Sequence, residues 1–410
     1  MPASTPAGRL VGIVCAAQVL VQIGAYFWPA LLPGLVGPWG LTYTEAGWIT
    51  AVFYGAYMAS VPILVTLTDR VDPRRIYLLG VGLTISGHLY FGLAAEGFWS
   101  AFLGRALAGI GWAGTYMTGL KLLADRVNER MMSRAVAAHA AGIGVAGALS
   151  FATGDLIAGL AGWQAAFLVA AASAALAWVM VWSAVPGRAA VSPTAPAGMK
   201  LFDFRPVLRN RSAMAYALAY CIHTLEMNAL RGWAVAFLVY VAAATGTDSS
   251  LSPTWVATGF ALLGTVASVA GNEAAIRLGR RRLIHAAMIG SILIAMALAL
   301  AGTASYTVAV VLLTLYGAVV WLDSSSLTAG SAGTADPGRR GATLAVHSML
   351  GYAGGFVGPL AVGWILDLSG GMSPAAWAAA FSTVALLMLL ALLAFWLMRP
   401  RELEGDLRKP

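Results

Sequence analysis

The sequence predicts an all-α membrane protein with twelve transmembrane helices in two six-helix halves. Hydrophobic residues make up 60% of the 410 residues and charged residues only 10%, whereas a soluble domain carries about 25% charged residues. Apolar runs recur along the chain, and each is close to the ~20 residues that a helix needs to cross a bilayer. Short loops rich in arginine alternate with loops that contain no basic residue.

The alternation of basic and non-basic loops predicts the topology. Because basic loops stay on the cytoplasmic side, both termini should be cytoplasmic, and the protein should lie in the inner (cytoplasmic) membrane. The same distribution makes the positive charge a topology signal, which argues against nucleic-acid binding. The basic segments are Arg9, 70–75, 126–134, 188–211, 277–282, 339–340 and 399–409, and the non-basic connectors lie near Pro38, Glu96, Gly162, Asp248, Thr303 and Gly371.

The spans fall into an N-terminal half, residues 1–185, and a C-terminal half, residues 212–410. Residues 186–211 are rich in Pro, Ala and Ser and should form a cytoplasmic linker between the halves. Asp72-Pro73 supplies a turn between the second and third spans, since proline fixes φ. The expected spans are about 9–36, 44–67, 76–95, 98–124, 133–160 and 163–185, then 212–241, 254–276, 283–301, 306–332, 343–368 and 374–398.

Polar residues inside spans are costly in lipid and are therefore the candidate functional residues. In the first half, Arg105 lies outside every basic loop. In the second half, Glu226 and Asp323 could load protons, and His223 is of a type that titrates near neutral pH. The candidate substrate-binding residues are Arg105, Arg231, Gln18, Gln22, Tyr26, Trp112, Tyr116, Asn228, Tyr316 and Trp321, and the candidate proton-coupling residues are Glu226, Asp323 and His223.

Two basic loops stand at matching places in the halves, at 68–75 and 277–282. The first interleaves aspartate with arginine, which favours a gate that closes the cytoplasmic side. The second lacks the matching aspartate. Loop 336–340 is similar in position and charge to loop 125–134. The candidate gating residues are Asp69, Arg70, Arg74, Arg75, Asp125, Arg277, Arg280, Arg281 and Asp336.

These motifs resemble those of the major facilitator superfamily of secondary transporters. Its loop motif Gly-x-x-x-Asp-Arg-x-Gly-Arg-Arg is matched at Asp69, Arg70, Arg74 and Arg75, with one extra residue in the turn, and its Arg-x-x-x-Gly-x-Gly motif at Arg105, Gly109 and Gly111. The resemblance covers about residues 9–400. It implies that spans 1, 4, 7 and 10 line a central cavity between the halves.

The favoured function is a secondary active transporter that moves a small organic anion by alternating access, coupled to protons. Two cavity arginines with few compensating carboxylates motivate the anion. The alternatives are a drug/proton antiporter that exports hydrophobic cations and, in another class, a transporter-like nutrient sensor. No nucleophile–base set, metal spacing or phosphate loop indicates an enzyme, a metal or a cofactor. The two cysteines lie inside spans and predict no disulfide, and the expected partners are the substrate, protons and lipid, with the protein a monomer.

Overall fold

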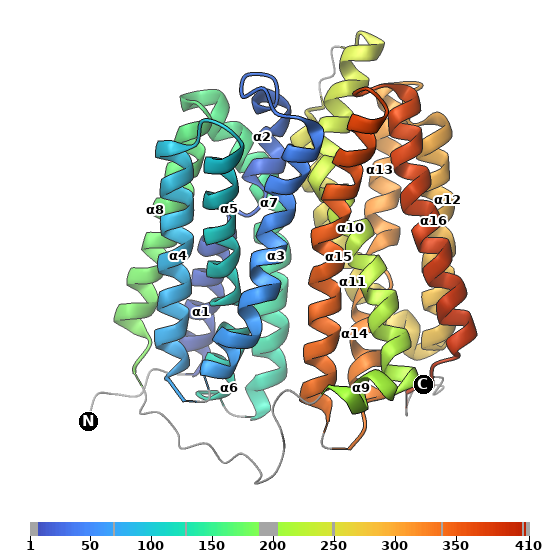
Figure 1. Ribbon diagram of the computed structural model, residues 1–410. Helices are drawn as coiled ribbons and strands as arrows, with labels where there is room; N and C mark the ends of the chain where they lie inside the picture. The colour runs from blue at the N-terminus through green and yellow to red at the C-terminus, as the bar shows by residue number, and fades with distance from the viewer. Residues whose placement is uncertain are drawn as a thin grey trace. The chain divides into compact units, whose positions relative to one another are not determined.

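The computed structural model (Figure 1) describes residues 7–68, 70–127, 129–187, 204–247, 251–337, 339–403 and 406, without the side chains of residues 129, 130 and 133. Within these ranges the chain is helical and contains no β-strand. Its contacts divide it into two compact units, which are described separately. One comprises Met1–Leu41 and Val52–Ala197, and the other comprises Thr42–Ala51 and Gly198–Pro410.

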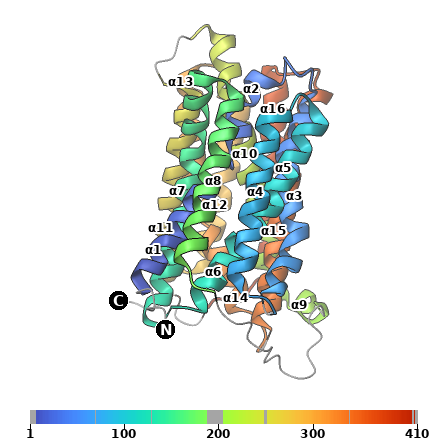
Figure 2. The ribbon, with the colours of Figure 1, turned by 90° about the vertical axis from the view of Figure 1, so that its left-hand side faces the viewer.

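The first unit is a helical bundle in which α4 packs against α5 and α8, and α1 packs against α7 and α8. Figure 2 shows α4 and α8 side by side along their length. Leu10, Val14, Tyr77 and Val181 belong to its apolar core. The helices are α1 (Ala7–Gln22), α2 (Phe27–Leu35), α3 (Tyr43–Leu67), α4 (Pro73–Ala94), α5 (Phe98–Ala113), α6 (Tyr116–Ala124), α7 (Glu129–Ala161) and α8 (Trp163–Ala184).

The second unit is organised around the long helix α10, which packs along α15. The start of α3 also belongs to this unit, because the Asp367 carboxylate accepts hydrogen bonds from the backbone N–H groups of Tyr43 (3.0 Å) and Thr44 (2.7 Å). The helices are α9 (Arg205–Arg209), α10 (Arg211–Thr245), α11 (Pro253–Leu278), α12 (Arg280–Ala301), α13 (Tyr306–Val320), α14 (Ser324–Gly333), α15 (Arg340–Leu368) and α16 (Pro374–Met398).

Glycines of α15 make the close packing with α10 possible. A methyl group added at Gly354 would overlap the backbone carbonyl oxygen of Cys221, and one at Gly358 would overlap that of Leu225. Small residues let two helix backbones approach closely. The closest neighbours of Gly354 and Gly358 therefore lie within the second unit.

Three predicted spans are interrupted helices. The first is split at Ile23–Tyr26 into α1 and α2, the fourth at Gly114–Thr115 into α5 and α6, and the tenth at Trp321–Asp323 into α13 and α14. Eleven segments of the described chain are long and apolar enough to cross a membrane. The predicted fourth span, which consists of α5 and α6, is not among them. Counted with these eleven segments, it gives the twelve predicted spans.

Candidate functional site

Arg105 of α5 lies against the interruption between α1 and α2. Its side chain is buried, with the residue 2% exposed, and Nη1 donates a hydrogen bond to the Ala25 carbonyl oxygen at 3.0 Å. On the same interruption, the Tyr26 backbone N–H donates to Ser150 Oγ at 2.8 Å. Backbone groups freed by a helix break must find partners inside a membrane protein. Arg105 and Ser150 supply two such partners.

A row of aromatic rings extends from Arg105 through the first unit. The guanidinium lies 4.4 Å from the centre of the Phe53 ring. Phe53 stacks on Trp112 with ring centres 5.1 Å apart, Trp112 on Tyr116 at 6.2 Å, and Tyr116 on His139 at 6.0 Å. The structure therefore brings three predicted substrate-binding residues, Arg105, Trp112 and Tyr116, into one continuous row.

The predicted substrate-binding residues of the first span are buried inside the first unit. Gln18 accepts a hydrogen bond from the Tyr77 hydroxyl at 3.2 Å, and Gln22 is 4% exposed. Tyr26 stacks face to face on Phe151, with ring centres 5.2 Å apart. These contacts give Gln18 and Tyr26 partners within the bundle.

Glu226 of α10 forms the polar end of a small buried cavity in the second unit. The Tyr316 hydroxyl donates a hydrogen bond to its Oε1 at 2.6 Å, and the Ser291 hydroxyl also lies near the carboxyl group. The cavity of about 20 Å³ is otherwise lined mainly by apolar and aromatic side chains, including Trp233, Phe237 and Trp377. This volume holds about one water molecule, which could reach the carboxyl group.

His223 and Asp323 form a second buried pair in this unit. His223 Nδ1 lies 3.0 Å from Asp323 Oδ1, and both side chains are at most 4% exposed. Asp323 stands at the interruption between α13 and α14, directly before the first residue of α14. A buried charge is strongly disfavoured unless it is paired, and His223 is a partner within reach of Asp323 at the helix break.

Arg231 and His223 contact the same aromatic ring, that of Trp321. Its guanidinium is 4.6 Å from the centre of the Trp321 ring, and the His223 ring meets Trp321 edge to face at 6.5 Å. Tyr220 stacks on His223 at 5.5 Å and on His347 at 4.0 Å. The structure thus brings together all three predicted proton-coupling residues and the predicted substrate-binding residues Arg231, Tyr316 and Trp321. Asn228 donates instead to the Thr224 carbonyl oxygen of its own helix, at 2.9 Å.

The first basic loop is held by Asp72, a residue that the sequence predicts only as part of a turn. Asp72 is the N-cap of α4 and accepts the Arg74 backbone N–H at 3.0 Å. It also forms a buried ion pair of 2.8 Å with Arg126, and Arg74 donates to the Trp182 carbonyl oxygen. Aspartate followed by proline is a helix-start signal, and that signal could have identified Asp72. The predicted gate residue Asp69 lies outside the described residues.

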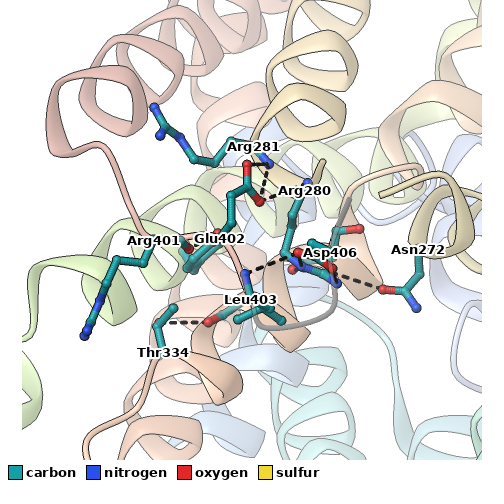
Figure 3. Close-up of polar contacts among 11 residues, drawn as sticks. Asn272, Arg280, Arg281, Thr334, Arg401, Glu402, Leu403 and Asp406 are labelled. Atoms are coloured by element: carbon teal, nitrogen blue, oxygen red, sulfur yellow. Dashed lines mark hydrogen bonds and ion pairs between the residues drawn. The ribbon is translucent and has the colours of Figure 1, made fainter. Parts of the chain in front are cut away.

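The second basic loop obtains its acidic partners from the C-terminal segment (Figure 3). The N-cap of α12 is Gly279, which has no side chain to cap the helix. Glu402 supplies the cap and accepts the backbone N–H groups of Arg280 (3.1 Å) and Arg281 (3.2 Å). Asp406 binds the Arg280 guanidinium through both oxygens, at 3.0 and 3.1 Å. The aspartate missing from this loop is therefore replaced by carboxylates more than 120 residues away in the chain.

The other predicted gating residues pair within their own unit or are exposed. Asp125 pairs with Lys121 one turn earlier at 2.8 Å, and Arg277 pairs with Glu273 in the same way at 2.9 Å. Asp336 accepts a hydrogen bond from Asn210 at 2.9 Å. Arg70 and Arg75 are exposed. Within the described ranges, no group of three or more His, Cys, Asp or Glu side chains could hold a metal ion.

Comparison with known proteins identifies the family of this fold. A model described as Major Facilitator Superfamily matches residues 14–318 and 227–409. The chain belongs to the Major Facilitator Superfamily. As a member of this family it is a multi-pass membrane protein, as the twelve-span topology and the two motifs predict.

Two relatives with similar sequences agree with this assignment. The chain is 26% identical over 175 residues to the uncharacterized MFS-type transporter YbcL and 32% identical over 126 residues to the methylenomycin A resistance protein, both from Bacillus subtilis (strain 168). These matches cover 42% and 30% of this chain and 44% and 27% of the relatives, so the chain spans less than half the length of these relatives.

Three structural likenesses cover nearly the whole chain. A bacterial homolog of the human lysosomal transporter Spinster, in an inward-facing and occupied conformation, gives a TM-score of 0.78 at 16% identity and 98% coverage of both chains. The nucleoside transporter NupG gives 0.74 at 14% identity, covering 94% of this chain and 99% of its own. The human organic anion transporter MFSD10 gives 0.68 at 18% identity, covering 95% and 100%. At these identities the likeness shows the fold.

Proposed function

We propose that this protein is a proton-coupled secondary transporter of a small solute, and that Glu226, His223 and Asp323 carry the proton. The observation that supports it is the placement of these three titratable side chains in the second unit. Glu226 of α10 contacts Tyr316 of α13, and His223 of α10 contacts Asp323 at the break before α14. An ionisable residue inside the membrane is a functional candidate by default, because its burial is costly. The cost is offset only if its charge changes during the cycle or is paired.

The proposed cycle couples the charge of these groups to the shape of the helix break. When a proton occupies Glu226, the carboxyl group is neutral and suits its apolar cavity. When the proton leaves, the Tyr316 hydroxyl is the hydrogen-bond donor that remains at 2.6 Å. Protonation of His223 turns its contact with Asp323 into an ion pair. Each state favours a different arrangement of α13 and α14, which is the link that secondary transport requires.

For the substrate we propose a small organic anion that contacts Arg231. Arginine offers a planar fork that suits carboxylate, phosphate or sulfate groups. Trp321 covers one face of this fork at 4.6 Å, which restrains the orientation of the guanidinium plane. In this proposal Arg105 has a structural role, because its hydrogen bond to the Ala25 carbonyl oxygen supports the interruption of the first span.

A second candidate is a drug/proton antiporter for hydrophobic cations. The cavity at Glu226 favours it, since a carboxylate surrounded by Trp233, Phe237 and Trp377 has the chemistry that recognises an apolar cation. The partial match to the methylenomycin A resistance protein points in the same direction. The two candidates differ in the charge of the ligand that stabilises the purified protein.

The topology proposal follows the basic loops. We place both termini and residues 186–211 on the cytoplasmic side of the inner membrane, with the protein acting as a monomer. Gate closure on that side would involve the two basic loops, each of which is braced inside its own unit by a buried ion pair, Asp72 with Arg126 and Asp406 with Arg280. These pairs would hold each loop in one shape. Asp69 and Arg70 would then make the contacts that differ between the open and the closed gate.

Two measurements test the proposal. A thermal-shift screen of the purified protein against metabolite anions and hydrophobic cations identifies the ligand class, because a bound ligand stabilises the fold by mass action. Proteoliposomes loaded with a pH-sensitive dye then report whether addition of that ligand moves protons across the membrane. Ligand uptake without any pH change would contradict proton coupling, and ligand binding without uptake would favour a nutrient sensor.

A further inference from the structure

An open pocket of about 720 Å³ lies at the end of the second unit where α10 begins and α16 ends. Four arginines line it: Arg205 and Arg209 of α9, Arg211 at the start of α10, and Arg401 of the C-terminal segment. The acidic residue that lines it is Asp336, so the lining carries four positive charges and one negative charge. Neither the transport proposal nor the gating proposal uses this pocket.

The C-terminal segment holds Arg401 in this pocket. Its backbone N–H donates to Ser212 Oγ at 3.1 Å, and its carbonyl oxygen accepts the Tyr216 hydroxyl at 2.9 Å. The next residue, Glu402, caps α12. In Figure 3 the Arg401 side chain points away from the Arg280–Asp406 pair. The carboxylates of Glu402 and Asp406 are thus engaged by the first two residues of α12, and Arg401 lines the pocket instead.

The pocket lies at the ends of two segments that are long and apolar enough to span a membrane. The membrane-spanning segments beside it begin at Arg211 and end at Met398, and arginines just outside a span lie among the lipid headgroups. Leu208, between the pocket arginines of α9, is 57% exposed, while Val207 is 2% exposed. Trp396 is 53% exposed in the last turn of α16, with the Arg399 guanidinium 6.0 Å from its ring. Exposed leucine and tryptophan beside arginine are typical of an interface with lipid.

We propose that this pocket binds a phosphate group, and that the headgroup of an anionic phospholipid supplies it. Arginines match a phosphate through their paired N–H donors, and basic pockets beside transmembrane helices bind anionic lipid headgroups. The exposed Leu208 and Trp396 favour the lipid as the source over a soluble phosphate, because a soluble ion gains nothing from apolar neighbours. Bound lipid would join α9, α10 and the C-terminal segment.

The test measures the affinity of detergent-solubilised protein for a fluorescent phosphatidylglycerol, by anisotropy. The double variant Arg209→Gln/Arg401→Gln should bind about 25-fold more weakly, since each basic side chain near an anionic lipid contributes a factor of about five. Arg211 is left in place because its guanidinium donates to the Leu397 carbonyl oxygen at 2.6 Å. Arg282→Gln, an exposed arginine of α12 outside the pocket, is the matched control and should bind like the parent protein.

A variant that should bind more tightly distinguishes lost lipid binding from misfolding, because misfolding would only weaken binding. Asp336→Asn removes the negative charge of the pocket and should tighten phosphatidylglycerol binding, while fluorescent phosphatidylcholine should bind all variants alike. Inorganic phosphate tests whether the ligand is a soluble ion instead. If phosphate protects the parent protein against thermal unfolding, and the double variant loses this protection while its lipid binding is unchanged, the lipid assignment is overturned. Equal phosphatidylglycerol affinity in the double variant and in Arg282→Gln, with no protection by phosphate, would overturn the pocket itself.

Discussion

Asp406→Asn should strongly destabilise the second unit. The substitution removes the charge that pairs with Arg280, and both side chains of this pair are 4% exposed. Loss of one partner of a buried ion pair costs about 3–5 kcal/mol, because the other charge stays buried and unpaired. We expect the lower end, about 3 kcal/mol, since Arg280 keeps hydrogen bonds to Asn272 Oδ1 (3.2 Å) and the Ser326 carbonyl oxygen (3.3 Å). Asparagine also retains one acceptor oxygen.

The assay is thermal unfolding of the purified protein in detergent. For a unit of this size each kcal/mol lowers Tm by about 2–4 °C, so the expected fall is about 6–12 °C. Glu273→Gln is the matched control, because it breaks the exposed Glu273–Arg277 pair, whose side chains are 57% and 69% exposed, and exposed pairs contribute less than about 1 kcal/mol. Adding Arg280→Met to Asp406→Asn should recover part of the loss. If Asp406→Asn unfolds within a degree of Glu273→Gln, the C-terminal segment does not brace α12.

Three further predictions concern the substrate, the packing and the topology. Arg231→Lys should lose most ligand binding in thermal-shift assays although the charge is kept, because lysine lacks the planar fork that stacks on Trp321; unchanged protection by an anion would contradict the anion proposal. Gly354→Ala should lower Tm more than Gly259→Ala, since the first methyl group overlaps the Cys221 carbonyl oxygen and the second has open space; equal effects would contradict close packing of α10 on α15. A single cysteine at Ala195 should resist membrane-impermeant labelling in intact cells, and labelling from outside would overturn the proposed orientation.

The sequence predicts the helical architecture well because span length and loop charge are local properties. A run of about twenty apolar residues is visible in any window, and the motifs at Asp69–Arg75 and Arg105–Gly111 lie within one or two turns of chain. The interruptions at Ile23–Tyr26 and Trp321–Asp323 are not visible in this way. They contain no proline, and at the first of them the partners of the backbone, Ser150 and Arg105, are distant in the chain.

Part of the candidate site could be predicted because several of its residues lie close together in the sequence. The spacing on α10 groups His223, Glu226 and Arg231 on one helix, and the structure adds their partners Tyr316, Trp321 and Asp323 from the tenth span. The acidic partners of the second basic loop could not be found by spacing. Glu402 and Asp406 lie 121 to 126 residues from the arginines that they bind, and only the fold shows that the C-terminal segment returns to α12.

Proton coupling through Glu226 is the central claim, and one variant tests it most directly. Glu226→Gln keeps the shape and one acceptor oxygen for the Tyr316 hydroxyl but cannot exchange a proton. In proteoliposomes, this variant should exchange substrate by counterflow at a rate close to that of the parent protein, while accumulation driven by a pH gradient is lost. Accumulation at the parental level in the Glu226→Gln variant would contradict the account.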